Sequence, residues 1–392
     1  MTTTKNNEHK KLNVPNLRFP KFQGEWEKYK VSDLLDFYST NSLSWDKLEY
    51  GTDAIQNLHY GLIHVGLSTM IDLSKDKLPN ITNGNTPKNY ELCQEGDIAF
   101  ADASEDTNEV AKAVEFYKLK GKDVICGLHT IHGRDNLQKT VVGYKGYAFS
   151  STAFHHQIRR IAQGTKIYSI NSKNFSECYI GIPSKEEQKK IATLLRLIDE
   201  RIVTQNKIID KLQSLIKGIA QKIVHSNKTN VRLSECVECS SSTLQESDVC
   251  EHGAYPVYGA NGIVGYLDNY NTEGEAVYII KDGSGVGTVS YVTGKCSATG
   301  TLNTLQAKEG YSLQYLYYLL KVFNFEPYKT GMAIPHIYFK DYGKAKFFCP
   351  SYTEQLQYAQ SLSAIDSKLL VEKNILTSLS MQKKYLLRQM FI

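Results

Sequence analysis

Cysteine and histidine spacings are the first candidates for chemistry in this chain of 392 residues. Cys236-x-x-Cys239, followed by Cys250-x-His252, has a spacing typical of zinc ligands, and Cys126-x-x-His129-x-x-His132 offers a second set. An internal repeat argues against both. Cys236 and Cys239 align with apolar residues of the sister copy, and the second set has no ligands at its counterpart. We therefore expect reduced cysteines that serve as small core residues, and no metal site.

A glycine-rich segment is the next candidate. Asp282-Gly283-Ser284-Gly285-Val286-Gly287-Thr288 follows a strand-like run, as phosphate-binding loops do. It lacks the Lys-Ser/Thr end of a nucleotide loop, so a tight turn or a close approach to a large ligand is favoured. No two prolines are adjacent in the chain, which excludes the Pro-Pro-aromatic loop typical of DNA amino-methyltransferases. We expect no catalytic residues and no cofactor in this chain.

Two long helices are expected to position the remaining residues. Residues 183–224 and 350–391 share one pattern at an offset of 167, with eleven identical pairs in forty-two and no gap. Each copy begins Pro-Ser-x-x-Glu, which predicts a capping box: Ser184 with Glu187, and Ser351 with Glu354. Apolar residues then recur at alternating steps of four and three, which is typical of a coiled-coil seam. Helices of about 60 Å cannot lie within one compact domain, so we expect them to pair and to act as a spacer.

The expected seam has a polar residue near the middle of each helix, Gln205 in the first and Glu372 in the second. If the helices pair antiparallel and in register, these two side chains meet, and such a polar pair fixes the register at some cost in stability. The seam residues are expected to be Leu195, Ile198, Ile202, Gln205, Ile209, Leu212, Leu362, Ile365, Leu369, Glu372, Leu376 and Leu379.

The repeat extends beyond the helices. Residues 232–239 match residues 30–37 in type, and Gly164-x-x-Ile167-x-x-Ile170 returns as Gly331-x-x-Ile334-x-x-Ile337. The chain is therefore expected to be a tandem duplication of two mixed α/β (α+β) domains, separated by two long antiparallel coiled-coil helices with pseudo-two-fold symmetry. The expected divisions are a flexible tail at 1–17, a first domain at 18–180, a central helix at 181–226, a second domain at 227–347 and a C-terminal helix at 348–392.

Local patterns predict some elements inside the domains. Strand-like runs occur at Asp97–Phe100, Val141–Phe149 and Ala276–Lys281. Helical runs occur at Ser151–Ala162 and Leu313–Phe323.

Charge and hydropathy exclude some classes of protein. The net charge is +5, but the excess lies on the helices: residues 1–183 carry +1 and residues 231–350 carry −3. Charge alone would therefore not make either domain a nucleic-acid binder. No run of eighteen apolar residues occurs, and the first sixteen residues have no apolar core. We expect a cytoplasmic protein without a membrane segment.

The layout resembles the specificity subunit of type I restriction–modification enzymes. The resemblance is carried by Gly164, Ile167, Ile170, Pro183, Ser184, Glu187, Gln188, Ile198 and Asp199, and by Gly331, Ile334, Ile337, Pro350, Ser351, Glu354, Gln355, Ile365 and Asp366. The entry Arg18-Phe19-Pro20 to Trp26 and the Tyr258-Gly259-Ala260-Asn261-Gly262 loop also look like that family. These motifs are weak singly and specific as a set, and they cover the chain beyond the tail.

The resemblance implies a protein without catalytic residues whose two domains each read one half of a split double-stranded DNA target. The long helices would dock two methyltransferase subunits and, through them, the restriction and translocase subunits. S-adenosylmethionine, ATP and magnesium would belong to those partners. The weak basicity of both domains departs from a simple DNA binder, so the partners are expected to supply much of the backbone contact.

Polar loop residues are the candidates for DNA contact. They are His129, His132, Arg134 and Lys166 in the first domain, and Asn261, Lys281, Ser284, Lys329 and His336 in the second. Arg and Lys suit guanine or phosphate, and Asn suits adenine. Two other classes remain open: a duplicated coiled-coil scaffold that binds only protein, and a self-contained nuclease or methyltransferase, which the missing motifs disfavour.

Overall fold

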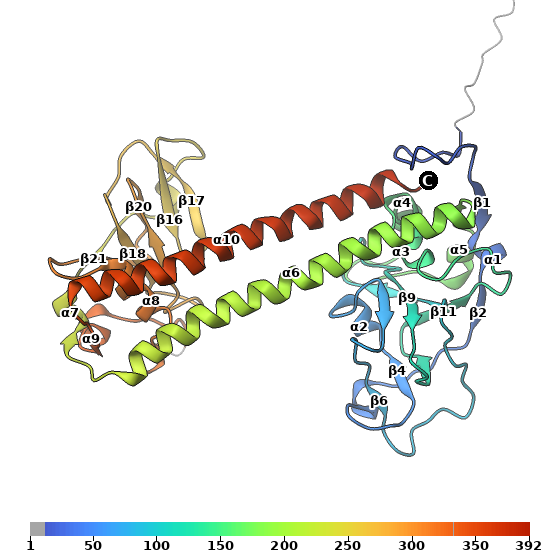
Figure 1. The fold of residues 1–392 in the computed structure, drawn as a ribbon, viewed down its shortest axis with the longest axis horizontal. Helices are drawn as coiled ribbons and strands as arrows, with labels where there is room; N and C mark the ends of the chain where they lie inside the picture. The colour runs from blue at the N-terminus through green and yellow to red at the C-terminus, as the bar shows by residue number, and fades with distance from the viewer. Residues whose placement is uncertain (1–11, 332) are drawn as a thin grey trace, which may run out of the picture. The chain divides into compact units, whose positions relative to one another are not determined.

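A computed structural model describes residues 12–331 and 333–392 (Figure 1). These residues divide into two compact units. The first contains the described residues up to Thr204 together with Leu376–Ile392, and the second is Gln205–Ile375. Each long helix therefore contributes part of its length to each unit. Within the described ranges, no helix combines the length and the apolar character needed to cross a membrane.

The first unit is built on two sheets. The larger has the order β2-β11-β7-β9-β5, and the smaller has the order β10-β4-β6-β3. The strands of the larger sheet are Asp36–Tyr38, Thr130–Arg134, Ile98–Ala101, Ala113–Lys118 and Met70–Asp72. Those of the smaller sheet are Val124–Cys126, Gln56–Leu58, Asn80–Ile81 and Leu48–Glu49. Two-stranded pairs join β1 (Glu27–Lys30) to β13 (Tyr179–Ile182) and β8 (Ala103–Ser104) to β12 (Tyr168–Ser169).

Short helices cover the sheets of the first unit. They are α1 (Val31–Leu34), α2 (Tyr60–His64), α3 (Lys145–Phe149), α4 (Thr152–Ile161) and α5 (Ser172–Ser176), with the 3-10 turn η1 at Trp45–Lys47. The main core gathers large aromatic residues such as Phe100, Phe149, Phe154 and Phe175. Edge-to-face ring contacts join them, with Phe149 and Phe154 centroids 4.8 Å apart.

The second unit repeats the central part of this architecture. Its sheets have the orders β15-β21-β18-β19 and β17-β16-β20, and β14 pairs with β22. The strands are Val237–Ser241, Leu302–Ala307, Ala276–Ile280, Val289–Val292, Gly262–Leu267, Tyr255–Gly259, Ser297–Ala298, Val231–Arg232 and Lys346–Phe347. The helices are α7 (Leu233–Cys236), α8 (Leu313–Leu320) and α9 (Phe339–Tyr342), with 3-10 turns η2 (Glu246–Asp248) and η3 (Glu326–Tyr328).

Register shows how the two sheets correspond. In the first unit β11 pairs antiparallel with β7 so that Thr130 faces Ala101, and in the second β21 pairs with β18 so that Leu302 faces Ile280. A parallel pair follows in each smaller sheet, β10 with β4 and β20 with β16. The prediction of two mixed α/β domains on long helices is therefore confirmed.

The long helices are α6 (Lys185–Ser226) and α10 (Tyr352–Gln389), and they begin differently from one another. Ser351 and Glu354 form the predicted capping box, with the Ser351 amide donating to Glu354 Oε2 at 3.1 Å. Glu187, in contrast, does not reach back to its cap. Its carboxylate is buried and accepts two hydrogen bonds from Arg18, each at 2.7 Å. The capping-box prediction is thus confirmed for α10. In α6 its hydroxyl half is confirmed, since Ser184 Oγ accepts from the Glu187 amide at 3.4 Å. Its carboxylate half is corrected, because an arginine offers a carboxylate stronger, bidentate hydrogen bonds than one amide does.

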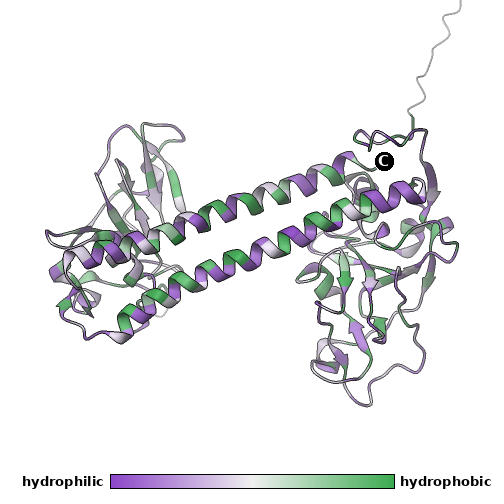
Figure 2. Cartoon of the chain, in the orientation of Figure 1, coloured by the Kyte–Doolittle hydropathy of each residue, from purple (hydrophilic) through white to green (hydrophobic). Residues whose placement is uncertain are grey.

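The two helices run antiparallel in each unit, and apolar positions recur along both (Figure 2). In the first unit Ile191, Leu195 and Ile198 share a core cluster with Leu386 and Met390. Lys383 Nζ also lies 2.6 Å from Asp199 Oδ1. All twelve residues expected in the seam are buried or half-buried.

The polar seam pair lies within the second unit. Gln205 Nε2 donates to the Glu372 carbonyl oxygen at 3.1 Å and to the Glu372 carboxylate. Both side chains are buried, with exposed fractions of 1% and 6%. The register argument is therefore confirmed: antiparallel helices related by a 167-residue repeat bring these two positions together.

Most of the local predictions match the structure, and one is wrong. The strand expected at 276–281 is β18, and the helices expected at 151–162 and 313–323 are α4 and α8. Val141–Phe149, expected to be a strand, instead turns into the helix α3, whose five residues are all buried. A short segment buried on all sides shows no helical period, so its apolar run resembles a buried strand.

Candidate nucleic-acid interface

One surface hairpin occurs in the same form in both units. Gln163 and Ser169 exchange two backbone hydrogen bonds, of 2.9 and 2.8 Å, and Thr330 and His336 exchange two of 2.9 and 2.7 Å. These pairs are 167 residues apart, which is the offset of the long helices. The hairpin is therefore a fixed part of the duplicated design.

A glycine permits the close turn in each hairpin. Gly164 has φ +140° and Gly331 has φ +86°. A Cβ atom would lie 1.9 Å from the Ile167 carbonyl oxygen in the first case and 2.4 Å from the Ile334 carbonyl oxygen in the second. Only glycine fits such an approach without displacing backbone, which explains the repeated Gly-x-x-Ile spacing.

The middle of each hairpin presents a large apolar side chain to solvent. Ile167 is 62% exposed and Ile334 is 59% exposed. An isolated exposed isoleucine is ordinary on a protein surface. Two at equivalent places in a duplicated hairpin suggest a shared contact, because nothing in the domain core requires them there.

Each hairpin lies against the loop that follows the inner strand of its sheet. In the first unit Asp102 accepts from the Ile170 amide at 3.0 Å and donates to His129 O at 3.1 Å through its backbone. In the second, Lys281 accepts from the Ile337 amide at 2.9 Å and donates to Thr301 O at 3.0 Å. An acidic and a basic residue thus occupy the same backbone position in the two units.

Each hairpin has an acid–histidine pair: Asp102 with His129 beside the first hairpin, and Asp282 with the hairpin residue His336 in the second. His129 Nδ1 lies 3.1 Å from Asp102 Oδ1, and His336 Nδ1 lies 2.6 Å from Asp282 Oδ1. All four side chains are between 31% and 50% exposed, so they can exchange hydrogen bonds with a ligand. An imidazole held by a carboxylate presents a defined donor or acceptor rather than a diffuse charge.

The first unit has a cavity of about 590 Å³ at this place. It is lined by Tyr60, His64, Ala103, Ser104, Glu105, Asp106, Glu109, Lys112, His129 and Ile167. The lining combines aromatic and apolar surface with the carboxylates of Glu105, Asp106 and Glu109, and Lys112 is paired with Glu109 at 2.7 Å. Carboxylates accept hydrogen bonds from the exocyclic amines of cytosine and adenine but repel phosphate. The chemistry suits contact with base edges more than contact with the DNA backbone.

The candidate residues from the sequence divide into two groups. His129, Lys166, Asn261 and Ser284 are exposed, and Lys281, Lys329 and His336 are half-buried. Asn261 lies in the two-residue turn between β16 and β17, where Gly259 pairs with Gly262. His129 and Lys166 lie in or beside the first hairpin, Lys281, Ser284 and His336 in or beside the second, and Lys329 pairs with Glu326 at 2.6 Å.

Two candidates lie inside the first unit, and those expectations are corrected. His132 is 0% exposed, and its Nε2 lies 2.7 Å from Asp97 Oδ2. The Arg134 side chain is 12% exposed and donates to both oxygens of Asp97, to Glu91 Oε1 and to Leu92 O. A guanidinium whose donors are occupied inside the domain cannot make a bidentate contact with guanine.

Electrostatics hold this buried group together. The hydrogen bonds that Arg134 donates to Asp97 raise the pKa of Arg134 against the effect of burial. Burial alone would raise the pKa of Asp97, but hydrogen bonds from His132 and Arg134 keep it below its usual value. The charged cluster is thus a structural element of the first sheet.

Sequence reasoning missed Ile167, Ile334, Asp102 and Asp282 as contact candidates. The two isoleucines were visible as part of the repeated Gly-x-x-Ile-x-x-Ile motif, but an apolar repeat is usually core. Their exposed fractions of 62% and 59% depend on the folded hairpins and are not indicated by the sequence pattern.

Two kinds of side-chain contact join each domain to a long helix, and both kinds recur in the two units. Tyr147 and Tyr318 donate to Asp199 and Asp366, at 2.9 and 3.3 Å. The side chains of Gln188 and Gln355 each accept from a domain backbone amide, at 2.8 and 2.9 Å. The paired positions on the helices are again 167 apart, so the domain–helix junction is duplicated as well. The same surface hairpin thus occurs twice, once on each domain, and each domain is held on the paired long helices. This arrangement is that of a binding protein with two similar binding domains.

The family model for the type I restriction modification DNA specificity domain matches residues 76–214 and 225–381, and the chain therefore belongs to that family. A putative type I specificity subunit of Mycoplasma genitalium is 26% identical over 306 residues, which cover 70% of this chain and 78% of that protein. The specificity subunit of the Escherichia coli EcoprrI restriction enzyme is 27% identical over 113 residues, covering 29% of this chain and 28% of that protein.

Solved structures show the same fold. A crystal structure of the type I restriction–modification S subunit from M. genitalium has a TM-score of 0.64 at 19% identity and covers 97% of this chain and 99% of that chain. A protein solved in work on complex assembly of a type I R-M system has a TM-score of 0.55 at 15% identity, with coverage of 92% and 96%. The chain is accordingly a specificity subunit of the type I restriction–modification class, with two DNA specificity domains.

Proposed function

We propose that each domain of this chain reads one half of a bipartite double-stranded DNA target, and that the paired hairpins make the contact. The observation that carries the proposal is the equivalent exposure of Ile167 and Ile334 beside acid–histidine pairs in both units. An exposed isoleucine can contact a thymine methyl group or enter a base step, and the neighbouring polar groups can bond base edges. Lys166, Lys281 and Asn261 supply further polar contacts under this proposal.

Matched substitutions in the two hairpins test this proposal. We expect Ile167→Ser to weaken protection of one half-site and Ile334→Ser to weaken protection of the other, in DNase footprinting of the chain assembled with its partners. Loss of the apolar contact is expected to cost about 1–2 kcal/mol, roughly 5- to 30-fold in Kd. Leu137→Ser and Ile263→Ser are the controls, because these side chains are 63% and 52% exposed in the same two units but lie outside the hairpins.

Equal effects of Ile167→Ser and Ile334→Ser on both half-sites would contradict the assignment, as would no effect from either. A complete absence of a split footprint in the unsubstituted complex would instead favour a scaffold that binds protein only.

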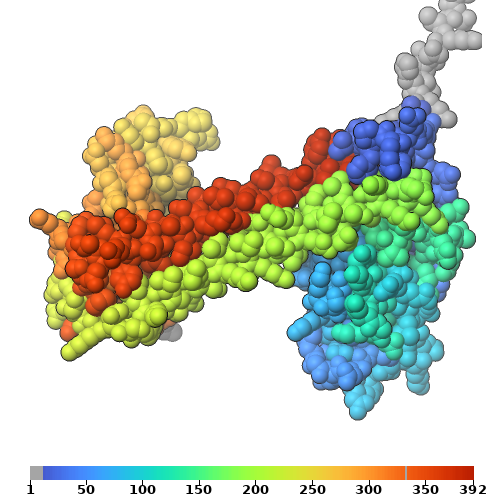
Figure 3. All heavy atoms as spheres, in the orientation of Figure 1, coloured from blue at the N-terminus to red at the C-terminus, as the bar shows by residue number. Residues whose placement is uncertain are grey.

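We also propose that the long helices dock two methyltransferase subunits and, through them, the restriction subunits. Both helices present large apolar side chains to solvent: Leu197, Val203, Ile208 and Leu215 on α6, and Leu356, Leu370, Val371, Met381 and Tyr385 on α10. Figure 3 shows that atoms of both helices form open surface. Large apolar side chains that stay exposed along two paired helices favour a protein interaction site there.

Introducing charged residues at exposed apolar positions of the long helices tests subunit docking independently of DNA recognition by the hairpins. Val203 and Leu370 occupy equivalent positions and are 45% and 61% exposed. We expect Val203→Glu and Leu370→Glu to reduce co-purification of methyltransferase subunits, with Lys211→Glu on α6 as the control. Normal recovery of two methyltransferase subunits with a variant that carries both Val203→Glu and Leu370→Glu would refute this docking surface.

Catalysis and cofactors are assigned to the partners in this proposal. The methyl donor, ATP and magnesium would bind there, and the complex would act in the cytoplasm. Methylation of DNA by the purified chain with S-adenosylmethionine and no partner would contradict it.

A further inference from the structure

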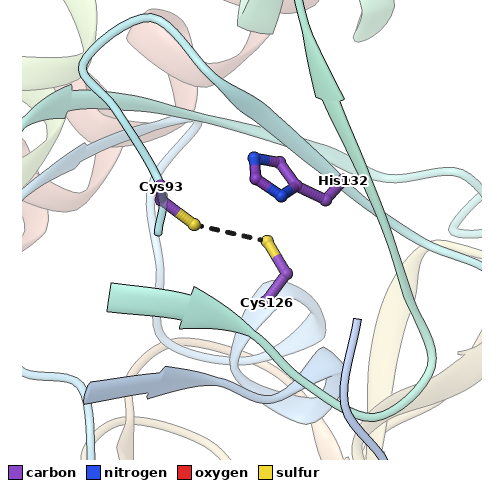
Figure 4. Close-up of side chains that lie close together, drawn as sticks. All are labelled: Cys93, Cys126 and His132. Atoms are coloured by element: carbon purple, nitrogen blue, oxygen red, sulfur yellow. Dashed lines mark hydrogen bonds between the residues drawn. The ribbon is translucent and has the colours of Figure 1, made fainter. Parts of the chain in front are cut away.

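A buried group in the first unit has the composition of a metal site. Cys93, Cys126 and His132 offer two sulfurs and one ring nitrogen that all lie within 4.8 Å of one another (Figure 4). Cys93 precedes β7, Cys126 ends β10 and His132 lies in β11. All three are buried, with exposed fractions of 6%, 1% and 0%.

One ring nitrogen of His132 needs a partner. Its Nε2 is engaged by Asp97, and its Nδ1 is buried and has no hydrogen-bond partner among the described residues. The ring is oriented toward the two sulfurs in Figure 4. An unsatisfied buried polar atom destabilises the folded state, so a ligand for Nδ1 would remove that penalty.

The spacing of the sulfurs matches a shared ligand. Cys93 Sγ and Cys126 Sγ are 3.6 Å apart. Two zinc–sulfur bonds of about 2.3 Å at a tetrahedral angle separate the sulfurs by about 3.8 Å. The backbone already brings these two side chains to the distance that one metal ion requires.

The surrounding groups also fit a metal-bound imidazole. Histidine ligands commonly donate their second ring N–H to a carboxylate, which fixes the ring orientation. Asp97 accepts from His132 in this way, and it also accepts two hydrogen bonds from Arg134. Arg134 neutralises the buried Asp97 carboxylate, and its second carboxylate partner, Glu91, is 35% exposed to solvent, so the three ligands are left to balance the ion.

We propose that Cys93, Cys126 and His132 Nδ1 bind one zinc ion. Two thiolates neutralise one divalent ion, whereas a monovalent ion would leave a buried negative charge. Binding forms two Zn–S bonds and one Zn–N bond, and each thiol releases its proton to solvent. Three protein ligands leave the fourth tetrahedral position for water.

The ion joins the two sheets of the first unit, because Cys126 belongs to the smaller sheet and His132 to the larger. The second unit is an internal control. Register places Thr304 of β21 where β11 has His132, so no zinc is expected there. The expected stoichiometry is therefore one ion per chain.

Metal analysis of the full chain, purified with its partners and without a metal-affinity step, tests the site. We expect about one zinc per chain, and less than about a tenth of that in Cys93→Ser, Cys126→Ser and His132→Gln. Cys178→Ser is the matched control, since Cys178 is a buried thiol of the same unit that donates to Asn174 O. Full zinc retention in Cys93→Ser, or zinc loss in Cys178→Ser, would overturn the proposal.

A second measurement uses the unsubstituted chain, so it does not depend on the folding of variants. After removal of zinc with a chelator under reducing conditions, added Co²⁺ should produce a thiolate-to-cobalt charge-transfer band that Zn²⁺ abolishes. An unsubstituted chain that contains no zinc and shows no such band would refute the site. A Cys93–Cys126 disulfide detected by mass analysis of that chain would refute it too, because it would consume both sulfurs.

Discussion

The two units share the central pairings of their sheets and their contacts with the long helices, and they differ in the polar side chains carried by one strand of the main sheet. In the first, strand β11 carries His132 and Arg134, which meet Asp97 in a buried charged cluster. In the second, the matching positions of β21 are Thr304 and Gln306, and Gln306 is exposed, with its amide on the Glu273 carbonyl. The paired backbone hydrogen bonds of the hairpins recur in both units, and so do the tyrosine and glutamine contacts between each domain and its long helix. The comparison shows that the repeat preserves the hairpins and the contacts that hold each domain on its long helix. The side chains of β11 and β21 have diverged.

The largest expected effect concerns the charged cluster. Arg134→Ala leaves the Asp97 carboxylate, which is 1% exposed, without its strongest partner, and we expect the first unit to lose about 3–5 kcal/mol of unfolding free energy. The matched change Gln306→Ala should cost no more than about 0.5 kcal/mol. Urea denaturation followed by hydrogen exchange in each unit measures both. Comparable losses from the two substitutions would show that the cluster is not a special support of the first unit.

The second comparison concerns the starts of the long helices. Arg18→Ala leaves Glu187 buried and without its bidentate partner, so we expect a loss of about 2–4 kcal/mol. Glu354→Gln, at the exposed cap of α10, should cost less than about 1 kcal/mol. The midpoint of thermal unfolding distinguishes the two variants. A larger loss of stability in Glu354→Gln than in Arg18→Ala would contradict the prediction that the buried carboxylate at the start of α6 contributes more than the exposed cap of α10.

The third prediction concerns the seam that serves both units. Gln205→Leu removes the donor that faces Glu372, and we expect it to cost about 1–3 kcal/mol. The double change Gln205→Leu with Glu372→Leu should recover much of this stability while weakening the register, since two apolar residues specify no unique pairing. Unfolding free energies of the single and double variants give the coupling between the side chains. Strict additivity would show that the pair does not interact.

The smallest effect tests what the two units share. Tyr147→Phe and Tyr318→Phe each remove one hydroxyl that donates to a helix aspartate, and each should cost about 1 kcal/mol. Similar losses from the two variants would support equivalent junctions. A loss of stability in only one of the two variants would show that the two hydrogen bonds contribute unequally despite their similar geometry. Tyr385→Phe is a control because its side chain is 56% exposed on α10.

Much of the frame was accessible from the residues alone. The offset of 167, the heptad spacing and the polar positions at Gln205 and Glu372 predict two antiparallel helices in a defined register, because side-chain periodicity follows directly from helix geometry. The family resemblance followed from the same repeat. Within the domains, β18, α4 and α8 were found where short local patterns placed them, and α3 was missed because complete burial erased its period.

Only the tertiary structure decided which polar residues reach solvent. Arg134 and Lys166 look equally suited to DNA in the sequence, yet one is saturated by Asp97 and Glu91 while the other is exposed. Cys93 and Cys126 are 33 residues apart, and their meeting with His132 depends on strand pairing between distant segments. Sequence by itself determined the repeated frame, since repeats and periodicity are local properties. Burial and the grouping of distant side chains arise from long-range packing, which no local spacing specifies.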